Sequence, residues 1–292
     1  MVRVLVFISL VSVSAACSRA DNSPPVATPS FVASKSRVAL GSPLDVTYKF
    51  DVAPGATIDG DYRVFVHVID ADGKELFNLD HDPPVPTSQW KAGQTVGPYT
   101  KTVFVPTVPY LGDATVRLGQ HKGPDRLTLT AQDPADRSSP SKEYKVGTIT
   151  IAPSSENLLM ITESGWHPDE YDAQNPTSSW RWTMKSASLR FRNPRKDSTL
   201  FLDYDARTDL FDDQPQSITV YSGDQVVTTF PAAQGITMQR IPLTAAQLGT
   251  GEMSGIRIEV DKTFVPATLP NGGADRRELG IRVFHVFVEP KG

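Results

Sequence analysis

Cysteine is nearly absent from this chain of 292 residues, which contains a single one, Cys17. Disulfide bonds within the chain are therefore excluded, and burial of an apolar core must stabilise the folded part. Strong charge is also missing, because 29 Lys and Arg residues face 33 Asp and Glu residues, giving a formal charge of -4. This balance lacks the electrostatic footprint of a nucleic-acid-binding protein.

Sequence motifs of the large enzyme classes are missing as well. The chain has no G-x-S-x-G, H-E-x-x-H, P-loop or dinucleotide-binding glycine motif. Its carboxylates are scattered, and no pair stands out as the acid and base of a glycosidase. The sequence therefore favours a non-catalytic protein without a cofactor. A polysaccharide-active hydrolase or lyase on a β-sandwich is the enzymatic alternative.

The chain has only one long apolar run, at its N-terminus. Arg3 precedes apolar residues 4–13, a length that suits a signal peptide and is too short to span a bilayer. Small residues at 14–16 lead directly to Cys17. This order resembles the lipobox of bacterial lipoproteins, although Ser14 stands where those proteins usually have an aliphatic residue.

The lipobox resemblance implies a signal peptide at residues 1–16 and lipidation of Cys17. It predicts export and anchoring in the cell envelope, facing the periplasm or on the outer membrane. A chance thiol behind an ordinary signal peptide is the alternative. Residues 17–29 are polar and contain Pro24-Pro25, so we expect a flexible tether there.

Residues 30–152 have the pattern of short β-strands. Apolar and polar residues alternate over 44–52, which predicts a strand with one buried face. The turn at Asp70 to Gly73 suits a hairpin. Together these features predict an immunoglobulin-like sandwich, with further strands at 62–69, 101–105, 114–118, 126–130 and 144–151.

Residues 156–290 form a second set of expected strands, behind a Pro- and Ser-containing boundary at 152–155. No amphipathic helices separate these strands, although 243–248 suits one helical turn. We therefore predict an all-β protein of two tandem β-sandwiches, the second of jelly-roll or galactose-binding-like type. Its expected strands are 188–191, 199–204, 217–221, 225–230, 238–241, 255–260 and 282–288.

Three tryptophans of the second half are the main candidates for a binding site. Trp180 and Trp182 are two residues apart, so on a strand they share one face. Arg181 points to the other face and should pair with a carboxylate or stay solvated. The indoles form either a wall of the core or an exposed platform for sugar rings. Trp166 precedes them in the same region and has the same two interpretations.

A charged run in the same half is the second part of this candidate site. Asp275, Arg276 and Arg277 stand at the expected start of the last strand. They form either an architectural ion-pair cluster or the rim of a pocket near the tryptophans, where arginine would donate to sugar hydroxyls.

Two other clusters have structural interpretations that outweigh metal binding. His67 and His81, with Asp80 and Asp82, lack tight metal-ligand spacing, so we expect hydrogen-bonded histidines and carboxylates that cap backbone N–H groups. Trp90, behind the same proline-rich loop, should plug one end of its sandwich. The acidic stretch of Asp203, Asp205, Asp209, Asp212 and Asp213 suits a solvated loop better than a calcium site. No metal site is predicted.

The first half carries a family resemblance. The run Phe65-Val66-His67, with Asp80-His81 and the run from Pro86 to Trp90, resembles an extracytoplasmic β domain. This domain is found on bacterial membrane glycosyltransferases of the protein-mannosyltransferase-like class. The second half is similar to another β module of such enzymes and of cell-surface polysaccharide systems. That similarity is carried by residues 165–167, 180–182, 264–267 and 275–280.

These resemblances imply accessory modules without a transferase, because no multi-helix catalytic part precedes them here, and they transfer no catalytic residue. The expected function is glycan binding or assistance in polysaccharide assembly. The expected partners are the membrane, through the lipid, and a glycan or a glycosyltransferase or polysaccharide-assembly protein. A structural adaptor that docks a membrane protein is the remaining alternative.

Overall fold

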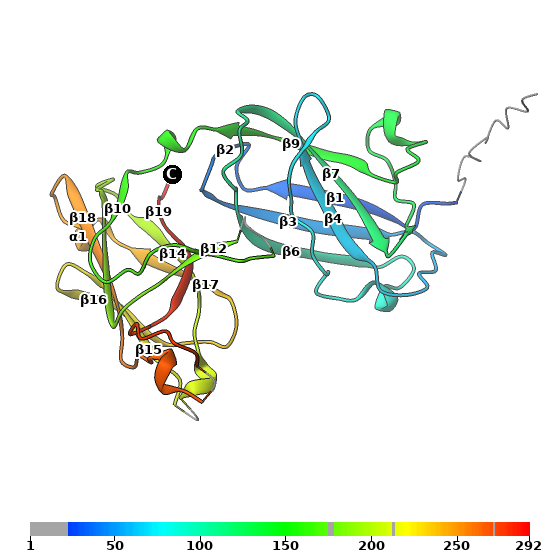
Figure 1. The fold of residues 1–292 in the computed structure, drawn as a ribbon. Coiled ribbons are helices and arrows are strands. Elements are labelled where there is room, and N and C mark those ends of the chain that lie inside the picture. The colour runs from blue at the N-terminus through cyan, green and yellow to red at the C-terminus, as the bar shows by residue number, and fades with distance from the viewer. Residues whose placement is uncertain (1–22, 175–177, 212–213, 271) are drawn as a thin grey trace, which may run out of the picture.

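The computed structural model describes residues 23–174, 178–211, 214–270 and 272–292. These residues form two tandem β-sandwiches that follow one another along the chain, as predicted (Figure 1). Cys17 and the expected signal peptide lie outside the described residues. Among the residues described, no helix combines the length and apolarity needed to cross a membrane.

The N-terminal sandwich consists of a sheet in the order β1-β3-β6 and a larger sheet in the order β2-β9-β7-β4-β5, with β8 paired to β7. All pairs are antiparallel except β2 with β9. The strands are β1 (Ala27–Ala33), β2 (Arg37–Ala39), β3 (Pro43–Val52), β4 (Arg63–Ile69), β5 (Glu75–Asn78), β6 (Thr95–Phe104), β7 (Gly112–Lys122), β8 (Asp125–Arg126) and β9 (Tyr144–Ala152). Short 3-10 helices are η1 (Thr87–Gln89), η2 (Pro134–Asp136) and η3 (Ser154–Glu156).

The core of this sandwich follows the alternation predicted for residues 44–52. In β3 every second side chain is buried, including Tyr48 and Phe50, which have no exposed surface. Trp90 closes one end as expected, since it is 7% exposed, packs on Phe50 and donates its indole N–H to the Val85 carbonyl at 2.9 Å. Aromatic side chains therefore contribute strongly to this core.

Two boundaries differ from the expectation. The strand predicted over residues 126–130 pairs only at Asp125–Arg126, and beyond it the chain is irregular. The chain turns away because it bonds instead to the start of β1, where Val26 donates to Thr128 and Thr130 donates to Ala27. Ala27 is also paired with Val52 of β3, so the first strand of the sandwich begins there and not at residue 30.

The C-terminal sandwich consists of two five-stranded sheets, in the orders β10-β13-β18-β15-β16 and β11-β12-β19-β14-β17. The strands are β10 (Met160–Thr162), β11 (Glu170–Tyr171), β12 (Ser179–Trp182), β13 (Ser186–Arg192), β14 (Ser198–Asp205), β15 (Ser217–Ser222), β16 (Gln225–Pro231), β17 (Thr237–Leu243), β18 (Met253–Val260) and β19 (Arg282–Pro290). The expected helical turn is α1 (Ala245–Leu248), begun by a capping box between Thr244 and Gln247. Short 3-10 helices are η4 (Thr208–Leu210) and η5 (Pro266–Thr268).

The core of the C-terminal sandwich is mostly aliphatic. Leu200 and Leu202 of β14 and Ile256 and Ile258 of β18 are almost fully buried. The final strand, β19, lies between β12 and β14 in the middle of its sheet. A register shift opposite Asp203 and Tyr204 interrupts the β14 and β19 pairing.

The two sandwiches meet along the outer face of β14, β17 and β19. Phe104 of β6 stacks on the His285 imidazole, with ring centroids 4.1 Å apart and planes 2° from parallel. Arg240 of β17 forms a two-pronged ion pair with Asp45 of β3. Asn157, just after the linker, bonds to both Ser42 and the Leu40 carbonyl. The two sandwiches are thus joined by contacts between their sheets and by hydrogen bonds of Asn157 next to the linker.

Candidate functional site

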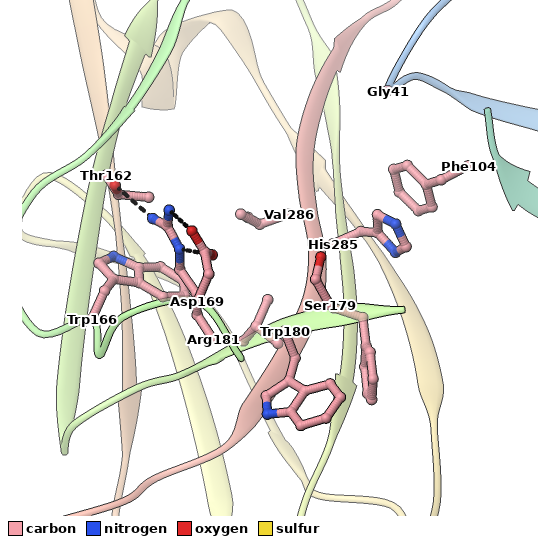
Figure 2. Close-up of a pocket in the computed structure, with 12 residues that line it drawn as sticks. Gly41, Phe104, Thr162, Trp166, Asp169, Ser179, Trp180, Arg181, His285 and Val286 are labelled. Atoms are coloured by element: carbon pink, nitrogen blue, oxygen red, sulfur yellow. Dashed lines mark hydrogen bonds and ion pairs between the residues drawn. The ribbon is translucent and has the colours of Figure 1, made fainter. Parts of the chain in front are cut away.

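An open hollow lies where the edge of β19 passes the N-terminal sandwich (Figure 2). Its volume is about 240 Å³. Both sandwiches contribute to its walls, which are formed by Gly41, Phe104, Thr162, Trp166, Asp169, Ser179, Trp180, Arg181, Val283, Phe284, His285 and Val286. β12 pairs with β19 only at Arg181–Val283 and Trp182–Arg282, and the hollow lies beside the next residues of β19, from Val283 to Val286.

One wall carries a fixed pair of charges. Arg181 donates through Nε and Nη2 to the two carboxylate oxygens of Asp169, and through Nη1 to Thr162 Oγ1 at 3.0 Å. Figure 2 shows these bonds beside Trp166. The hydrogen bonds from Arg181 hold the pKa of Asp169 below its ordinary value and raise the pKa of Arg181. The carboxylate partner that the sequence predicts for Arg181 is confirmed.

Trp180 forms the wall on the outer face of the sheet. Its indole is half-buried and donates its N–H to Glu170 Oε2 at 3.1 Å. The ring meets Phe284 edge to face at 6.1 Å, and the Arg282 guanidinium lies 5.1 Å from its centroid. Trp180 is therefore held in one orientation while part of its ring stays open to solvent.

Trp182 continues the same outer face. It is also half-buried, and its ring meets Phe264 at 5.6 Å with the planes 81° apart. Arg282, paired with Trp182 across the sheet, lies between the two indoles and forms an ion pair with Asp205. Phe284, Trp180, Trp182 and Phe264, together with Arg282, are called the aromatic stripe below.

Trp166 has a different environment from the other two indoles. Its N–H donates to the Ser188 carbonyl at 2.8 Å, and its ring packs against the core of the C-terminal sandwich. Only part of this ring reaches the hollow. The structure therefore separates the three candidate tryptophans into one core wall and two outer-face side chains.

Arg277 and Asp275 connect to Trp180 through Glu170. Arg277 donates to Asp275 through Nε and Nη2, at 3.0 and 2.7 Å, and to Glu170 Oε1 at 2.7 Å. The hydrogen bonds from Arg277 lower the pKa of Asp275 to about 2, while Asp275 and Glu170 raise the pKa of Arg277. The structure thus shows the ion-pair cluster, which positions the Glu170 carboxylate that accepts the Trp180 N–H. Asp275 and Arg277 are not among the residues that line the hollow, so their role as its rim stays a prediction.

The placement of this charged run differs from the expectation in one respect. Residues 275–280 do not begin the last strand, which starts at Arg282, because Leu279 pairs with Phe264 and its neighbours follow an irregular path. Arg276 is exposed, and among the residues described it has no ion pair.

Sequence reasoning missed Arg282, Phe284 and Asp169 as parts of the site, although it grouped Glu170 with the tryptophans. Arg282 and Phe284 lie in the strand that the sequence predicted over 282–288, but the sequence did not show which strand would pair with it. Only the pairing of β12 with β19 brings Arg282 between the indoles. Glu170 comes next to Trp180 by the short β11 pairing, which no sequence pattern indicated.

The histidines considered for metal binding have separate environments. His67 contacts Glu143 at 3.0 Å, whereas His81 is buried between Leu79 O and the Tyr99 hydroxyl, both at 2.9 Å from its ring nitrogens. Asp80 accepts the backbone N–H of Val66, the capping role expected of it. Within the described ranges, no three potential metal ligands converge.

The acidic stretch also divides among separate basic partners. Asp203 contacts His285, and Asp205 contacts Arg282, both from β14. Asp209 pairs with Arg207 in the loop that follows. Asp212 and Asp213 lie outside the described residues.

Comparisons with known proteins give no family for this chain. A comparison with protein-family models finds no match, and a search of curated proteins finds none either. Among solved structures, a β-glucuronidase from Bacteroides uniformis is similar at 10% identity and a TM-score of 0.29, over 90% of this chain and 30% of that one. The chain thus spans less than a third of that enzyme.

Two further structures come from bacterial proteins of other kinds. The CBM51-2 and INT domains of Clostridium perfringens ZmpB are 12% identical with a TM-score of 0.22, over 62% of this chain and 39% of that one. The collagen adhesin of S. aureus is 9% identical with a TM-score of 0.18, over 91% and 96%. Similarities this low carry no argument about function, and the resemblance to glycosyltransferase-associated modules stays a prediction.

Proposed function

We propose that this protein binds glycans at the hollow between its two sandwiches. The observation that carries this proposal is the position of Trp180. Trp180 lines the same hollow as the Arg181–Asp169 pair, and its half-buried indole lies on the opposite face of β12 from that pair (Figure 2). Sugar rings present apolar C–H faces and hydroxyl groups together, so a flat aromatic surface beside fixed donors and acceptors matches them.

The polar groups of the hollow suit hydroxyl recognition. Arg181 is a rigid forked donor, and Asp169 is a pure acceptor while it is ionised. Ser179 and Thr162 add hydroxyls to the lining. These side chains are already oriented by hydrogen bonds to one another, so little conformational entropy is lost when a ligand binds.

A non-catalytic role agrees with the charges in the hollow. Glycoside hydrolysis requires a carboxylic acid that stays protonated near neutral pH, usually through a raised pKa. Arg181 instead holds the pKa of Asp169 below its ordinary value. We therefore favour binding over hydrolysis at this site.

We also propose that the protein is exported and held in the cell envelope by a lipid on Cys17, where it would act beside polysaccharide-assembly proteins. The position of Cys17 after small residues supports this. Metabolic labelling with a fatty acid should mark the wild type but not the Cys17→Ser variant. Equal labelling of the two proteins would exclude the anchor.

Glycan retention by the full chain without its signal peptide tests the binding site. Wild type and Trp180→Ala are compared on an array of bacterial surface glycans, with Val226→Ala as control. Val226 is 52% exposed on β16, in the opposite sheet, so its loss should leave binding unchanged. We expect Trp180→Ala to lose retention while keeping its fold. Absence of glycan retention by the wild type would contradict the proposal.

A further inference from the structure

The aromatic stripe extends the candidate site well beyond the hollow. We infer that it binds an extended, uncharged oligosaccharide, with one sugar in the hollow and the following sugars over Trp182 toward Phe264. This inference rests on the proposed glycan binding at the hollow. It adds two properties that the hollow alone does not require, namely chain length and lack of charge.

Continuity of the stripe is the first argument. Phe284 and Trp180 border the hollow, and Trp182 follows Trp180 on the same face of β12. Phe264 contacts the Trp182 ring but is itself only 8% exposed, so it supports that ring and is not a stacking position. Two residues along a strand advance about 6.6 Å, so successive indoles offer successive stacking positions in one direction. A single sugar ring would use only the beginning of this surface.

Arg282 gives the stripe a fixed shape. Its guanidinium lies 5.1 Å from Trp180, 5.9 Å from Trp182 and 5.1 Å from Phe284, and its ion pair with Asp205 anchors it to β14. Cation–π contacts of this kind hold aromatic rings in place. The rings therefore form a preorganised surface, which lowers the entropic cost of binding.

The far end of the stripe again combines apolar and polar groups. A second hollow there is lined by Phe264, Leu269, Thr263 and Glu278, among others. Thr263 donates its hydroxyl hydrogen to Glu278 Oε1 at 2.7 Å. Phe264 is only 8% exposed, so this end offers a later sugar of the same chain mainly the oriented oxygen atoms of Thr263 and Glu278.

The ion pairs argue for an uncharged ligand. Arg181, Arg277 and Arg282 each have a carboxylate partner, so none of these three guanidinium groups is free for a sugar carboxylate or sulfate. Arg276 has no ion pair among the described residues, but no cation–π contact joins it to the rings of the stripe. An anionic sugar would have to displace Asp169, Glu170 or Asp205, which would leave a partly buried carboxylate without its partner. Hydroxyl groups can instead use the N–H groups and oxygen atoms that remain free in each pair.

The experiment measures the affinity of the full chain without its signal peptide for oligosaccharides of increasing length. Neutral gluco- and manno-oligosaccharides from one to six sugars are compared with oligouronic acids of equal length. For the wild type we expect affinity for neutral chains to rise with length and uronic acids to bind more weakly. We expect Trp182→Ala to lower the affinity for the longer neutral chains by roughly two- to ten-fold per lost stacking contact, so that affinity no longer rises with length. The affinity for monosaccharides should be unchanged.

Three results would overturn the inference, and they are distinguishable. Length-independent binding of neutral sugars leaves the hollow as a glycan site but excludes the stripe. Tighter binding of uronic acids excludes the uncharged ligand. Failure of every oligosaccharide to bind removes the proposed function as well.

Two control variants distinguish a loss of binding from a loss of folding. Val226→Ala should behave as wild type in all these measurements. If Trp182→Ala has a markedly lower unfolding temperature, Trp182→Leu replaces it, because leucine keeps apolar bulk but offers no flat ring for stacking. A Trp182→Leu variant that retains the full gain with length would equally exclude the stripe.

Discussion

The two sandwiches place their tryptophan side chains differently. The N-terminal sandwich buries Tyr48, Phe50 and Trp90 in its core. The C-terminal sandwich also buries two aromatic rings, those of Phe191 and Tyr204, but it places Trp180 and Trp182 half-buried on the outer face of a sheet. An apolar core does not require indoles, so those on the outer face need another explanation.

The indole N–H groups of Trp90 and Trp180 also have different hydrogen-bond acceptors. Trp90 donates to a backbone carbonyl inside the protein, as a structural side chain does. Trp180 donates to Glu170, a carboxylate that is itself held by Arg277. Such a supporting arrangement orients the ring without burying it, which is a typical property of binding sites.

The largest expected effect is on the core indole. Trp90→Ala should lower the free energy of unfolding by roughly 3–5 kcal/mol, because it removes a large buried ring and leaves a cavity against Phe50. Urea denaturation followed by circular dichroism measures this. Trp90→Phe, which keeps part of the ring, should lose less. A loss similar to that of Trp180→Ala would remove the distinction between the two sandwiches.

A smaller effect is expected from protonation in the N-terminal core. Burial, reinforced by Lys101, lowers the pKa of His81, although the Leu79 carbonyl and the carboxylates of Asp80 and Asp82 oppose this. In the neutral ring, Nδ1 of His81 donates its hydrogen to the Leu79 carbonyl. Nε2 of His81 therefore carries no hydrogen and accepts a hydrogen bond from the Tyr99 hydroxyl.

The sign of the pH effect follows from the lowered pKa. The unfolded chain binds a proton near pH 6.5, whereas folded His81 resists it, so this contribution to stability is complete above pH 6.5 and is lost as pH falls through the lower folded value. Unfolding midpoints measured between pH 7.5 and 5 should fall more steeply for wild type than for His81→Gln. Parallel curves for the two proteins would contradict this.

Trp180→Ala should affect stability less than loss of the core indole. Because the ring is only half-buried, we expect a decrease of about 1 kcal/mol in the free energy of unfolding. The measurement is the same urea titration, with Val226→Ala as the exposed control. A loss of several kcal/mol would identify Trp180 as a core residue and weaken the case for a binding surface.

The smallest effect is expected at the contact between the two sandwiches. Arg240→Ala removes the ion pair with Asp45, but the side chains are 43% and 28% exposed, so solvent screens it. We expect a loss of roughly 0.2–1 kcal/mol, most evident at low salt. Thermal unfolding at two salt concentrations measures it. Separate unfolding transitions in the variant would identify this pair as the main link between the sandwiches.

The sequence was informative where periodicity alone determines structure. Alternation over residues 44–52 predicted β3 and its buried face, and the spacing of Trp180 and Trp182 predicted their shared face. The strand expected over 126–130 was wrong beyond Arg126, because hydrogen bonds to residues about a hundred positions earlier override the local pattern.

The candidate site was only partly predictable for the same physical reason. Arg277 and Asp275 were named from composition, but their connection to Trp180 depends on Glu170, which reaches it by cross-strand pairing. Arg282 comes between the indoles through a pairing of residues a hundred positions apart. Contacts of this separation leave no trace in the periodicity of a single sequence.

The central position of β19 has a consequence for how the chain acquires its structure. In the N-terminal sandwich, every strand is available once residue 152 has been made, so this half can fold while the rest is still being synthesised. In the C-terminal sandwich, β12 and β14 wait for residues 282–290 to come between them. A nascent chain therefore exposes two unpaired strand edges until this segment arrives, a period in which chaperone protection would matter most.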